Sequence, residues 1–298
     1  MATHALPQRY SVEHETRYAY TAPVSQSWQL ARLTPRALPW QRLVAHSLRI
    51  EPGPDEQRDE SDSYGNTVTH FGLHGAHRVL SVRMNCLVEV GERAALPDGA
   101  ATPAWEQVRD AVRREPQLDD LVPAGMCEPT TLVPFSEGAL LYAAPSFAHG
   151  RPWFDAVREL MHRIHADFEF DPGATTVSTS VDEVLYQRRG VCQDFAHLML
   201  ACLRGLGLPA RYVSGYLLTD PPPGQPRLMG ADASHAWIAA YAPEAGWIEF
   251  DPTNDQLADR RYITLTWGAD FADVVPLRGV ILGGGEQRMD VEVSVVPV

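Results

Sequence analysis

The sequence predicts an α+β protein in which an antiparallel β domain precedes a mixed core, and three observations support this class. Residues 8–93 alternate apolar and polar side chains, with turn clusters between the runs, which is typical of several short strands. Residues 195–206 are mostly apolar, and about a dozen such residues have the length of a buried helix. Two strand-like runs follow that helix, at 234–241 and 246–251. Several short strands that come first without intervening helices suggest an antiparallel sandwich ahead of the mixed core.

Residues 1–100 are predicted to form an N-terminal antiparallel β-sandwich-like domain. Between Tyr10 and Tyr20, every second residue would lie on one face of a strand. Four further strands are expected at Trp28–Thr34, Val44–Glu51, Thr67–Leu73 and Val79–Val90. Several short strands separated by turn clusters are typical of a small sandwich.

Residues 101–150 are predicted to hold one helix and a linker. Thr102 and Pro103 fit the N-cap and first position of a helix that reaches about Glu115. The following segment, 116–150, contains Pro116, Pro123, Pro129, Pro134 and Pro145. Because proline interrupts regular structure, this segment is interpreted as the linker between the two domains.

Residues 151–270 are predicted to form the core, and they begin with an amphipathic helix. Its apolar residues recur at helical spacing: Phe154, Val157, Leu160, Met161, Ile164 and Phe168. Ser180-Val181-Asp182-Glu183 fits a capping box and would start a short helix that leads to Arg188. After the buried helix, strands are expected at Ala210–Leu218 and Ile263–Trp267.

Residues 271–298 are predicted to form a C-terminal β segment. The run Met289–Val296 alternates well enough to join a sheet. The sequence leaves open whether this strand returns to the N-terminal domain.

The stretch Arg188–His197 places a cysteine at the start of the buried helix. Gly190 gives the chain a flexible approach, and Gly205 and Gly207 stand where a C-terminal cap belongs. Cys192 would therefore lie at the helix N-terminus, where free N–H groups and the helix dipole favour a thiolate. This position suits a nucleophile better than it suits packing.

A thiol nucleophile needs a base, and the base needs a group that orients it. His235 introduces the first strand-like run, and Asp251 ends the second, directly before Pro252. If the two runs pair as a hairpin, His235 and Asp251 come close in space. The order Cys192, His235, Asp251 is a thiol version of the catalytic triad.

The other reactive side chains have plainer interpretations. Cys202 lies inside the apolar helix and is expected to pack, whereas Cys86 and Cys127 show no partner pattern. Without a CxxC spacing, the cysteines suggest neither a disulfide framework nor a zinc site. Asp194 is expected to stabilise the first helical turn through the helix dipole. His197 is expected to be a hydrogen-bonded core histidine.

Three motifs in chain order resemble the transglutaminase-like core: Gly190-Val191-Cys192-Gln193-Asp194, Ser234-His235-Ala236-Trp237, and Gly246-Trp247 through Phe250-Asp251-Pro252-Thr253-Asn254. The segments Tyr10–Tyr18 and Asp62–Asn66 resemble the N-terminal region of the bacterial members, and Asp273–Gly279 resembles their C-terminal segment. The resemblance implies a papain-like thiol fold for the core, with its catalytic residues at the positions of the three motifs. Such cores include crosslinkers, proteases, amidases and inactive members, so the reaction stays open.

The expected function is thiol-dependent acyl transfer on amide bonds. Cys192 would attack an amide carbonyl, His235 would protonate the leaving amine, and an amine or water would resolve the acyl-enzyme. Two alternatives remain: a cysteine peptidase or amidase that uses water as acceptor, and a non-catalytic scaffold that keeps the fold. The substrate is expected to be a peptide or protein amide.

Two further features of the site are expected. An oxyanion hole would use the backbone N–H of Cys192 and a second donor from Gln187, Tyr216 or Gln193. The segment Thr219–Gly230, with three consecutive prolines, cannot be regular structure. It is expected to be a flap beside the site.

Composition limits the partners. With 298 residues, 45% hydrophobic and 21% charged residues, the chain is globular. Its net charge of −13 argues against nucleic acid or an anionic membrane as a partner. No metal or organic cofactor is expected. For calcium in particular, the sequence has no acidic loop of the EF-hand type. Without a basic-apolar leader or an apolar run near 18 residues, a cytoplasmic location is expected. Oligomeric state is left open.

Overall fold

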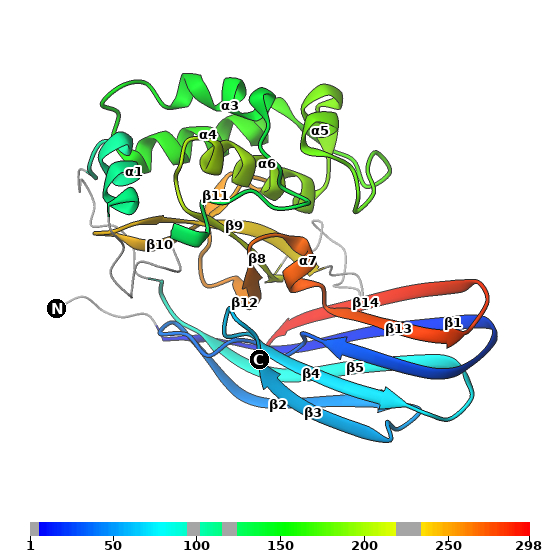
Figure 1. The fold of residues 1–298 in the computed structure, drawn as a ribbon. Helices are drawn as coiled ribbons and strands as arrows, with labels where there is room; N and C mark the ends of the chain where they lie inside the picture. Colours follow the sequence, from blue (N-terminus) through cyan, green and yellow to red (C-terminus); the bar gives the residue numbers. More distant parts are fainter. Residues whose placement is uncertain (1–5, 94–101, 115–123, 219–233) are drawn as a thin grey trace, which may run out of the picture.

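The computed structural model describes residues 6–93, 102–114, 124–218 and 234–298. Figure 1 shows helices over a small sheet in the upper part of the molecule, and a larger set of strands below them. Helices and antiparallel strands are therefore segregated, and the α+β class is confirmed.

The strands of the lower part form one seven-stranded antiparallel sheet around the long strand β1 (Gln8–Ala31). Its other members are β2 (Gln41–Glu51), β3 (Glu56–Ser61), β4 (Thr67–Leu73), β5 (His77–Val90), β13 (Leu277–Gly283) and β14 (Gln287–Pro297). The first half of β1 pairs with β5 and β14, and its second half pairs with β4 and β13. The register changes between Ala19 and Val24, where the sheet curls.

The curled sheet encloses a hydrophobic core of its own. Tyr10 and Val12 from the first half of β1 share this core with Phe71 and Leu73 from β4. The two halves of the sheet thus pack face to face, so the predicted sandwich-like N-terminal domain is confirmed (Figure 1).

Two details of the strand prediction differ from the structure, and one open point is decided by it. Trp28–Thr34 is not a separate strand, because β1 continues without a break to Ala31. Strand β3 is absent from the prediction because all six of its residues are polar and exposed, as a sheet edge permits. The C-terminal strand β14, whose partner the sequence left open, pairs along β1 from Tyr10 to Tyr20.

The helical layer covers one face of a second sheet (Figure 1). Its helices are α1 (Trp105–Arg113), α3 (Glu137–Ala143), η2 (Ala144–Ser146), α4 (Trp153–Asp167), α5 (Val181–Gln187) and α6 (Cys192–Gly205), with the short α7 (Phe271–Val274) nearby. Four of the apolar residues predicted for α4 are buried in it, Val157, Leu160, Met161 and Ile164. Phe154 is half-buried, and Phe168 lies just beyond the helix as its C-cap. Helix α5 begins with the predicted capping box at Ser180. Helix α6 ends before Gly207, whose φ of 75° suits glycine.

Two predictions for the segment before α4 were wrong. Thr102 does not cap α1, whose N-cap is Ala104 without a side-chain bond. Instead the Thr102 hydroxyl accepts a hydrogen bond from the backbone N–H of Phe154, in the first turn of α4. The expected linker also contains helix α3, which is capped by Ser136. Its buried residues contact α6 in the core. A short helix can form between prolines where a cap and a packing partner coincide, and this explains why the linker prediction missed it.

The second sheet has five strands in the order β11-β10-β9-β8-β12. They are β8 (Ala210–Leu217), β9 (Ser234–Ala242), β10 (Gly246–Asp251), β11 (Gln256–Leu257) and β12 (Tyr262–Gly268). Helix α6 packs on one face of this sheet. Tyr216 of β8 and Ile263 of β12 contribute instead to the core of the sandwich. The sheet therefore joins the helical layer to the N-terminal domain.

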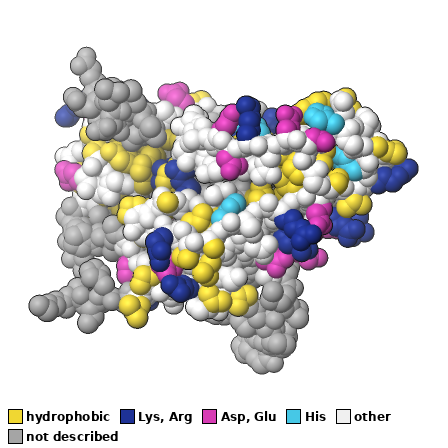
Figure 2. Space-filling model, turned by 90° about the horizontal axis from the view of Figure 1, so that it is seen from below, with side chains coloured by type: hydrophobic (Ala, Val, Ile, Leu, Met, Phe, Trp, Pro, Cys, Tyr) yellow, Lys and Arg dark blue, Asp and Glu magenta, His cyan; other side chains and the backbone are white. Residues whose placement is uncertain are grey.

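Two short features complete the fold. Strands β6 (Glu169–Phe170) and β7 (Arg189–Gly190) pair in parallel just before α6. The face seen from below carries acidic and basic side chains interspersed with apolar ones (Figure 2). Within the described ranges, no helix combines the length and the apolar content that crossing a membrane requires.

Candidate active site

Cys192, His235 and Asp251 come together where α6 begins and the β9–β10 hairpin opens. Cys192 is the first residue of α6 and is half-buried. His235 is the second residue of β9, and Asp251 is the last residue of β10. The strands pair from Gly246↔Ala242 to Phe250↔Ile238, so the predicted hairpin is confirmed.

The imidazole of His235 lies between the other two side chains. Its Nε2 atom is 2.7 Å from Oδ2 of Asp251. The side chain of Cys192 is close enough to the imidazole to contribute to the raised pKa of His235. The structure therefore brings Cys192, His235 and Asp251 together in one cluster.

The electrostatics of this cluster favour a charged imidazole. Burial alone would lower the pKa of His235, but hydrogen bonds with Asp251 and Cys192 outweigh burial and raise this pKa to about 10. Burial would raise the pKa of Asp251, yet the hydrogen bond with His235 holds it below its usual value. An imidazolium beside a sulfur atom stabilises a thiolate. The imidazole can thus hold a proton at neutral pH and act as an acid.

Asp251 is completely buried, and its carboxylate is held by several donors. Oδ1 accepts from the backbone N–H groups of Thr253 at 2.9 Å and Asn254 at 3.3 Å. Oδ2 accepts from the Asn254 amide at 2.7 Å and from the hydroxyl of Tyr262 at 2.6 Å, besides His235. Such a carboxylate has a fixed orientation. Neither Asn254 nor Tyr262 was singled out from the sequence for this contact.

Trp237 supports the histidine from one side. Its ring lies nearly parallel to that of His235, with centroids 5.9 Å apart and planes 27° apart. The indole N–H donates to Glu249 Oε2 at 2.8 Å, which fixes the ring. The Ser-His-Ala-Trp motif therefore supplies both the base and the side chain against which it packs.

The loop before Cys192 is fixed by Asp194. The buried Asp194 carboxylate accepts from the backbone N–H of Val191 at 2.8 Å and from the Thr175 hydroxyl at 2.6 Å. Burial raises the pKa of Asp194. A Cβ atom at Gly190 would lie 2.8 Å from Asp194 Oδ2, so this close approach requires glycine. Asp194 thus fixes the approach to α6 by hydrogen bonds, beyond the dipole effect expected from the sequence.

The three side chains considered as second oxyanion donors have different surroundings. The Tyr216 hydroxyl is hydrogen-bonded to His14 Nδ1 at 2.8 Å, where β8 packs against the sandwich. Gln187 is exposed at the end of α5. The Gln193 amide donates to the carbonyl of Val177 at 3.4 Å. The backbone N–H of Cys192, in the first turn of α6, has no intrahelical acceptor and points outward from the helix end.

The positions of the other three cysteines and of His197 are explained by packing and hydrogen bonding. All four cysteines are free. Burial raises the pKa of Cys86 to about 12 and that of Cys127 to about 11, and it also raises that of Cys202. His197 accepts a hydrogen bond from the backbone N–H of Phe271 at 3.2 Å, as expected for a core histidine. The expected flap, Thr219–Gly230, lies outside the described residues.

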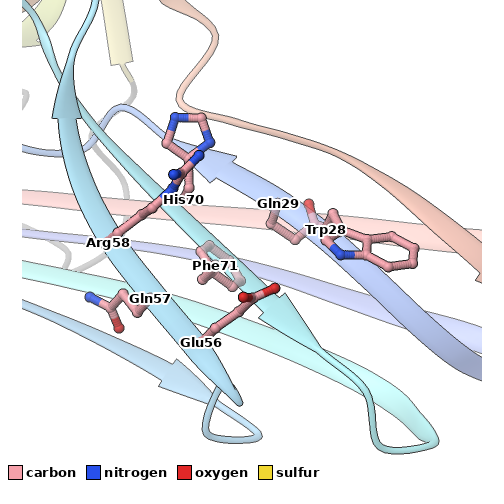
Figure 3. A pocket seen from close by; sticks show the side chains of 7 residues that line it. All are labelled: Trp28, Gln29, Glu56, Gln57, Arg58, His70 and Phe71. Carbon is pink, nitrogen blue, oxygen red and sulfur yellow. The ribbon is translucent and has the colours of Figure 1, made fainter.

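Two other kinds of site, a metal centre and a surface pocket, have weaker support in the described residues. In the described parts of the chain, no three or more His, Cys, Asp or Glu side chains gather as a metal site would require. A hollow of about 520 Å³ lies on the sandwich (Figure 3), where Glu56 and Arg58 of β3 face His70 of β4 and Trp28 of β1. Its charged side chains already have partners, since Arg58 and His70 both contact Glu60.

Both parts of the chain match known protein families. Residues 10–89 match the bacterial transglutaminase-like N-terminal region, and residues 143–252 match the transglutaminase-like superfamily. The chain is 43% identical, over 300 residues, to an uncharacterized protein of Mycobacterium tuberculosis; the match covers 97% of this chain and 93% of that protein. An uncharacterized protein of Mycobacterium leprae is 33% identical, with 96% of this chain and 98% of that protein covered.

Two further similarities concern proteins with a named activity. A protein-glutamine gamma-glutamyltransferase of Pseudomonas aeruginosa is 31% identical over 131 residues, which is 38% of this chain and 20% of that protein. The solved structure of a candidate cysteine protease from Cytophaga hutchinsonii superposes with a TM-score of 0.77 at 19% identity, covering 99% of this chain and 92% of that one. This second similarity shows that the whole fold is shared.

Proposed function

This chain belongs to the transglutaminase-like superfamily and carries the bacterial N-terminal region, and from this premise we propose that it transfers acyl groups from amide bonds through Cys192, His235 and Asp251. One observation carries the proposal: the His235 imidazole is hydrogen-bonded to Asp251 at 2.7 Å, and both Asp251 and the nearby Cys192 raise its pKa. A buried structural cysteine would have no need of an oriented, charged histidine.

The first half of the proposed reaction forms a thioester. The Cys192 thiolate attacks the amide carbonyl, and a C–S bond forms while the carbonyl oxygen takes the negative charge. The N–H groups at the start of α6 stabilise this oxyanion. The C–N bond then breaks, and the His235 imidazolium gives its proton to the leaving amine.

The second half releases the acyl group. Neutral His235 takes a proton from an incoming amine or water, which attacks the thioester carbonyl and expels the Cys192 thiolate. Asp251 stabilises the imidazolium and keeps the ring in one orientation throughout. An amine acceptor gives a new amide, and water gives a carboxylate.

The similarity to the Pseudomonas aeruginosa glutamyltransferase favours a glutamine carboxamide as the acyl donor and an amine as the acceptor. The chain itself contains no lysine, because all 25 of its basic Lys or Arg residues are arginine. Its side chains therefore offer no primary amine for self-crosslinking. Apart from its α-amino group, the protein supplies no primary amine, so a new amide in an assay would otherwise come from the added amine, a peptide or another protein.

The test is a library of glutamine-containing peptides incubated with the protein, with and without a primary amine, and analysed by mass spectrometry. Replacement of the carboxamide NH₂ by the amine supports acyl transfer. Replacement by OH, or peptide cleavage, would instead identify a hydrolase. Cys192→Ala serves as the control for every product. No product with the intact protein, together with an unreactive Cys192, would leave the scaffold alternative.

A further inference from the structure

The carboxylate of Asp251 receives a hydrogen bond from a strand with which β10 does not pair. Tyr262, the first residue of β12, donates its hydroxyl proton to Asp251 Oδ2 at 2.6 Å. In the sheet, β9 and β8 lie between β10 and β12. The phenol ring crosses this distance by packing edge-on against Trp237, with centroids 5.2 Å apart. Tyr262 is completely buried, so water does not compete for this bond.

The direction of this hydrogen bond is fixed by a second one. Gln256 Nε2 donates to the Tyr262 hydroxyl oxygen at 2.5 Å. Gln256 Oε1 in turn accepts from Arg261 at 2.8 Å, which sets the orientation of the amide. An ionised carboxylate can only accept. The Tyr262 hydroxyl must therefore accept from Gln256 and donate to Asp251. Burial first, and then the charge of Asp251, raise the pKa of Tyr262, so the hydroxyl stays protonated.

The backbone of Tyr262 is also anchored, and the anchor comes from the end of the sandwich. Arg93, just beyond β5, donates to the carbonyl oxygen of Tyr262 at 2.9 Å and to that of Asp259. The same guanidinium lies 3.4 Å from Glu249, the acceptor of the Trp237 indole. The ring of Tyr262 therefore has a fixed place relative to the imidazole of His235, 6.1 Å away between centroids.

We propose that Tyr262 is a positioning residue for the triad, whose hydroxyl holds Asp251 Oδ2 in line with His235 Nε2 and shares the negative charge of that oxygen. The proposal rests on the proposed function, since it assigns a role within the same site. Three donors converge on Oδ2: His235, Asn254 and Tyr262. The Tyr262 hydroxyl limits how strongly the carboxylate stabilises the imidazolium, so His235 can give up its proton during turnover.

Removing the hydroxyl has two expected effects. In Tyr262→Phe the ring still packs against Trp237, but Oδ2 loses one donor and more of its charge acts on His235. The pKa of His235 should rise by about one unit. Turnover should fall by about 10- to 100-fold, the range known where an outer hydrogen bond orients a functional histidine.

The experiment has two arms. The first measures the pKa of His235 by NMR in the Cys192→Ala background, with and without Tyr262→Phe. In the described structure, the titratable groups that face His235 are Asp251, Cys192 and Tyr262. In the Cys192→Ala background, Asp251 is therefore the one ionised group among them. The second arm measures acyl-transfer turnover with Cys192 present. Tyr10→Phe is the matched control, because Tyr10 is equally buried and its hydroxyl contacts Gln8 and Arg260 instead.

A higher pKa of His235 in Tyr262→Phe, with Tyr10→Phe unchanged, supports the proposal. A pKa that stays or falls would overturn it, whatever happens to turnover. If Tyr262→Phe does not fold, Gln256→Leu takes its place: a hydroxyl that no longer accepts from Gln256 donates less strongly to Asp251, so the pKa of His235 should rise by a smaller amount, and a pKa that stays or falls again counts against the proposal. The NMR arm needs no turnover. If the native protein is inactive, the proposed function is refuted, but the pKa of His235 still shows whether the Tyr262 hydroxyl acts on Asp251.

Discussion

Oδ2 of Asp251 lies 2.7 Å from Nε2 of His235, and the register of one hairpin sets that distance. The last paired residues, Phe250 and Ile238, stand directly before Asp251 on one strand and three residues after His235 on the other. A shift of this register by one residue would turn one of the two side chains to the other face of the sheet. The contact therefore depends on the short turn between Ala242 and Gly246.

Asp251→Asn should lower turnover by about three to four orders of magnitude. An amide can present its N–H to His235 and no longer enforces the orientation and charge of the imidazole. Steady-state acyl-transfer assays measure the effect, and circular dichroism checks that the fold is retained. Asp255→Asn is the control, because Asp255 pairs with His162 on the surface. Near-normal turnover in Asp251→Asn would remove this residue from the triad.

Cys192 should be alkylated first when a trace of iodoacetamide is added at pH 6. The other three thiols are disfavoured because burial raises their pKa values, and only the thiolate reacts. Peptide mapping by mass spectrometry gives the order directly. His235→Ala should slow the labelling of Cys192 and leave that of Cys127 unchanged. Equal rates at Cys192 and Cys127 would mean that the imidazole does not activate the thiol.

Gly190→Ala should destabilise the protein by about 1–3 kcal/mol and slow the labelling of Cys192. The new methyl group would lie 2.8 Å from Asp194 Oδ2 and 2.9 Å from its Cβ, so the loop before α6 has to move. Urea unfolding gives the change in stability. Gly53→Ala is the matched control, since its methyl group would meet nothing within 4 Å. If the two variants unfold alike, the contact between Gly190 and Asp194 is looser than described.

His14 should make the protein less stable in mild acid. Burial lowers its pKa from 6.5 to about 4 in the folded state. A lowered folded pKa means that the unfolded chain binds the proton more readily, so stability is full above pH 6.5 and is lost as the pH falls toward 4. Between pH 7 and pH 5 the loss from this residue should be about 2 kcal/mol.

The measurement compares the free energy of unfolding in urea at pH 7 and pH 5. His14→Gln should reduce the difference between the two values, although it weakens the fold at pH 7 by losing the bond to Tyr216. His74→Gln, at an exposed site, is the matched control. Comparing variants cancels the contribution of His197, whose pKa burial also lowers to about 4. An unchanged difference in His14→Gln would contradict the assignment.

Local sequence signals predicted several elements because each depends on residues close together in the chain. The capping box at Ser180 is formed by residues three apart, and it stands where the sequence indicated. The apolar spacing of α4 and the cysteine at the start of α6 follow from the period of one helix. His235 and Asp251 are 16 residues apart and meet through a hairpin, which is also a local structure.

Contacts between distant segments were decided by the tertiary structure. The alternation of residues 289–296 predicted a strand, but nothing in it distinguished one sheet edge from another, and the structure pairs it with β1. Thr102 looked like a cap for the helix that follows it, yet its hydroxyl caps α4, 52 residues later. Tyr262 reaches Asp251 across two intervening strands. The sequence by itself thus predicted most of the elements and the three candidate site residues, because short-range periodicity and motif order encode them. Which donors surround Asp251 is decided only when buried polar groups from separate strands must find one another.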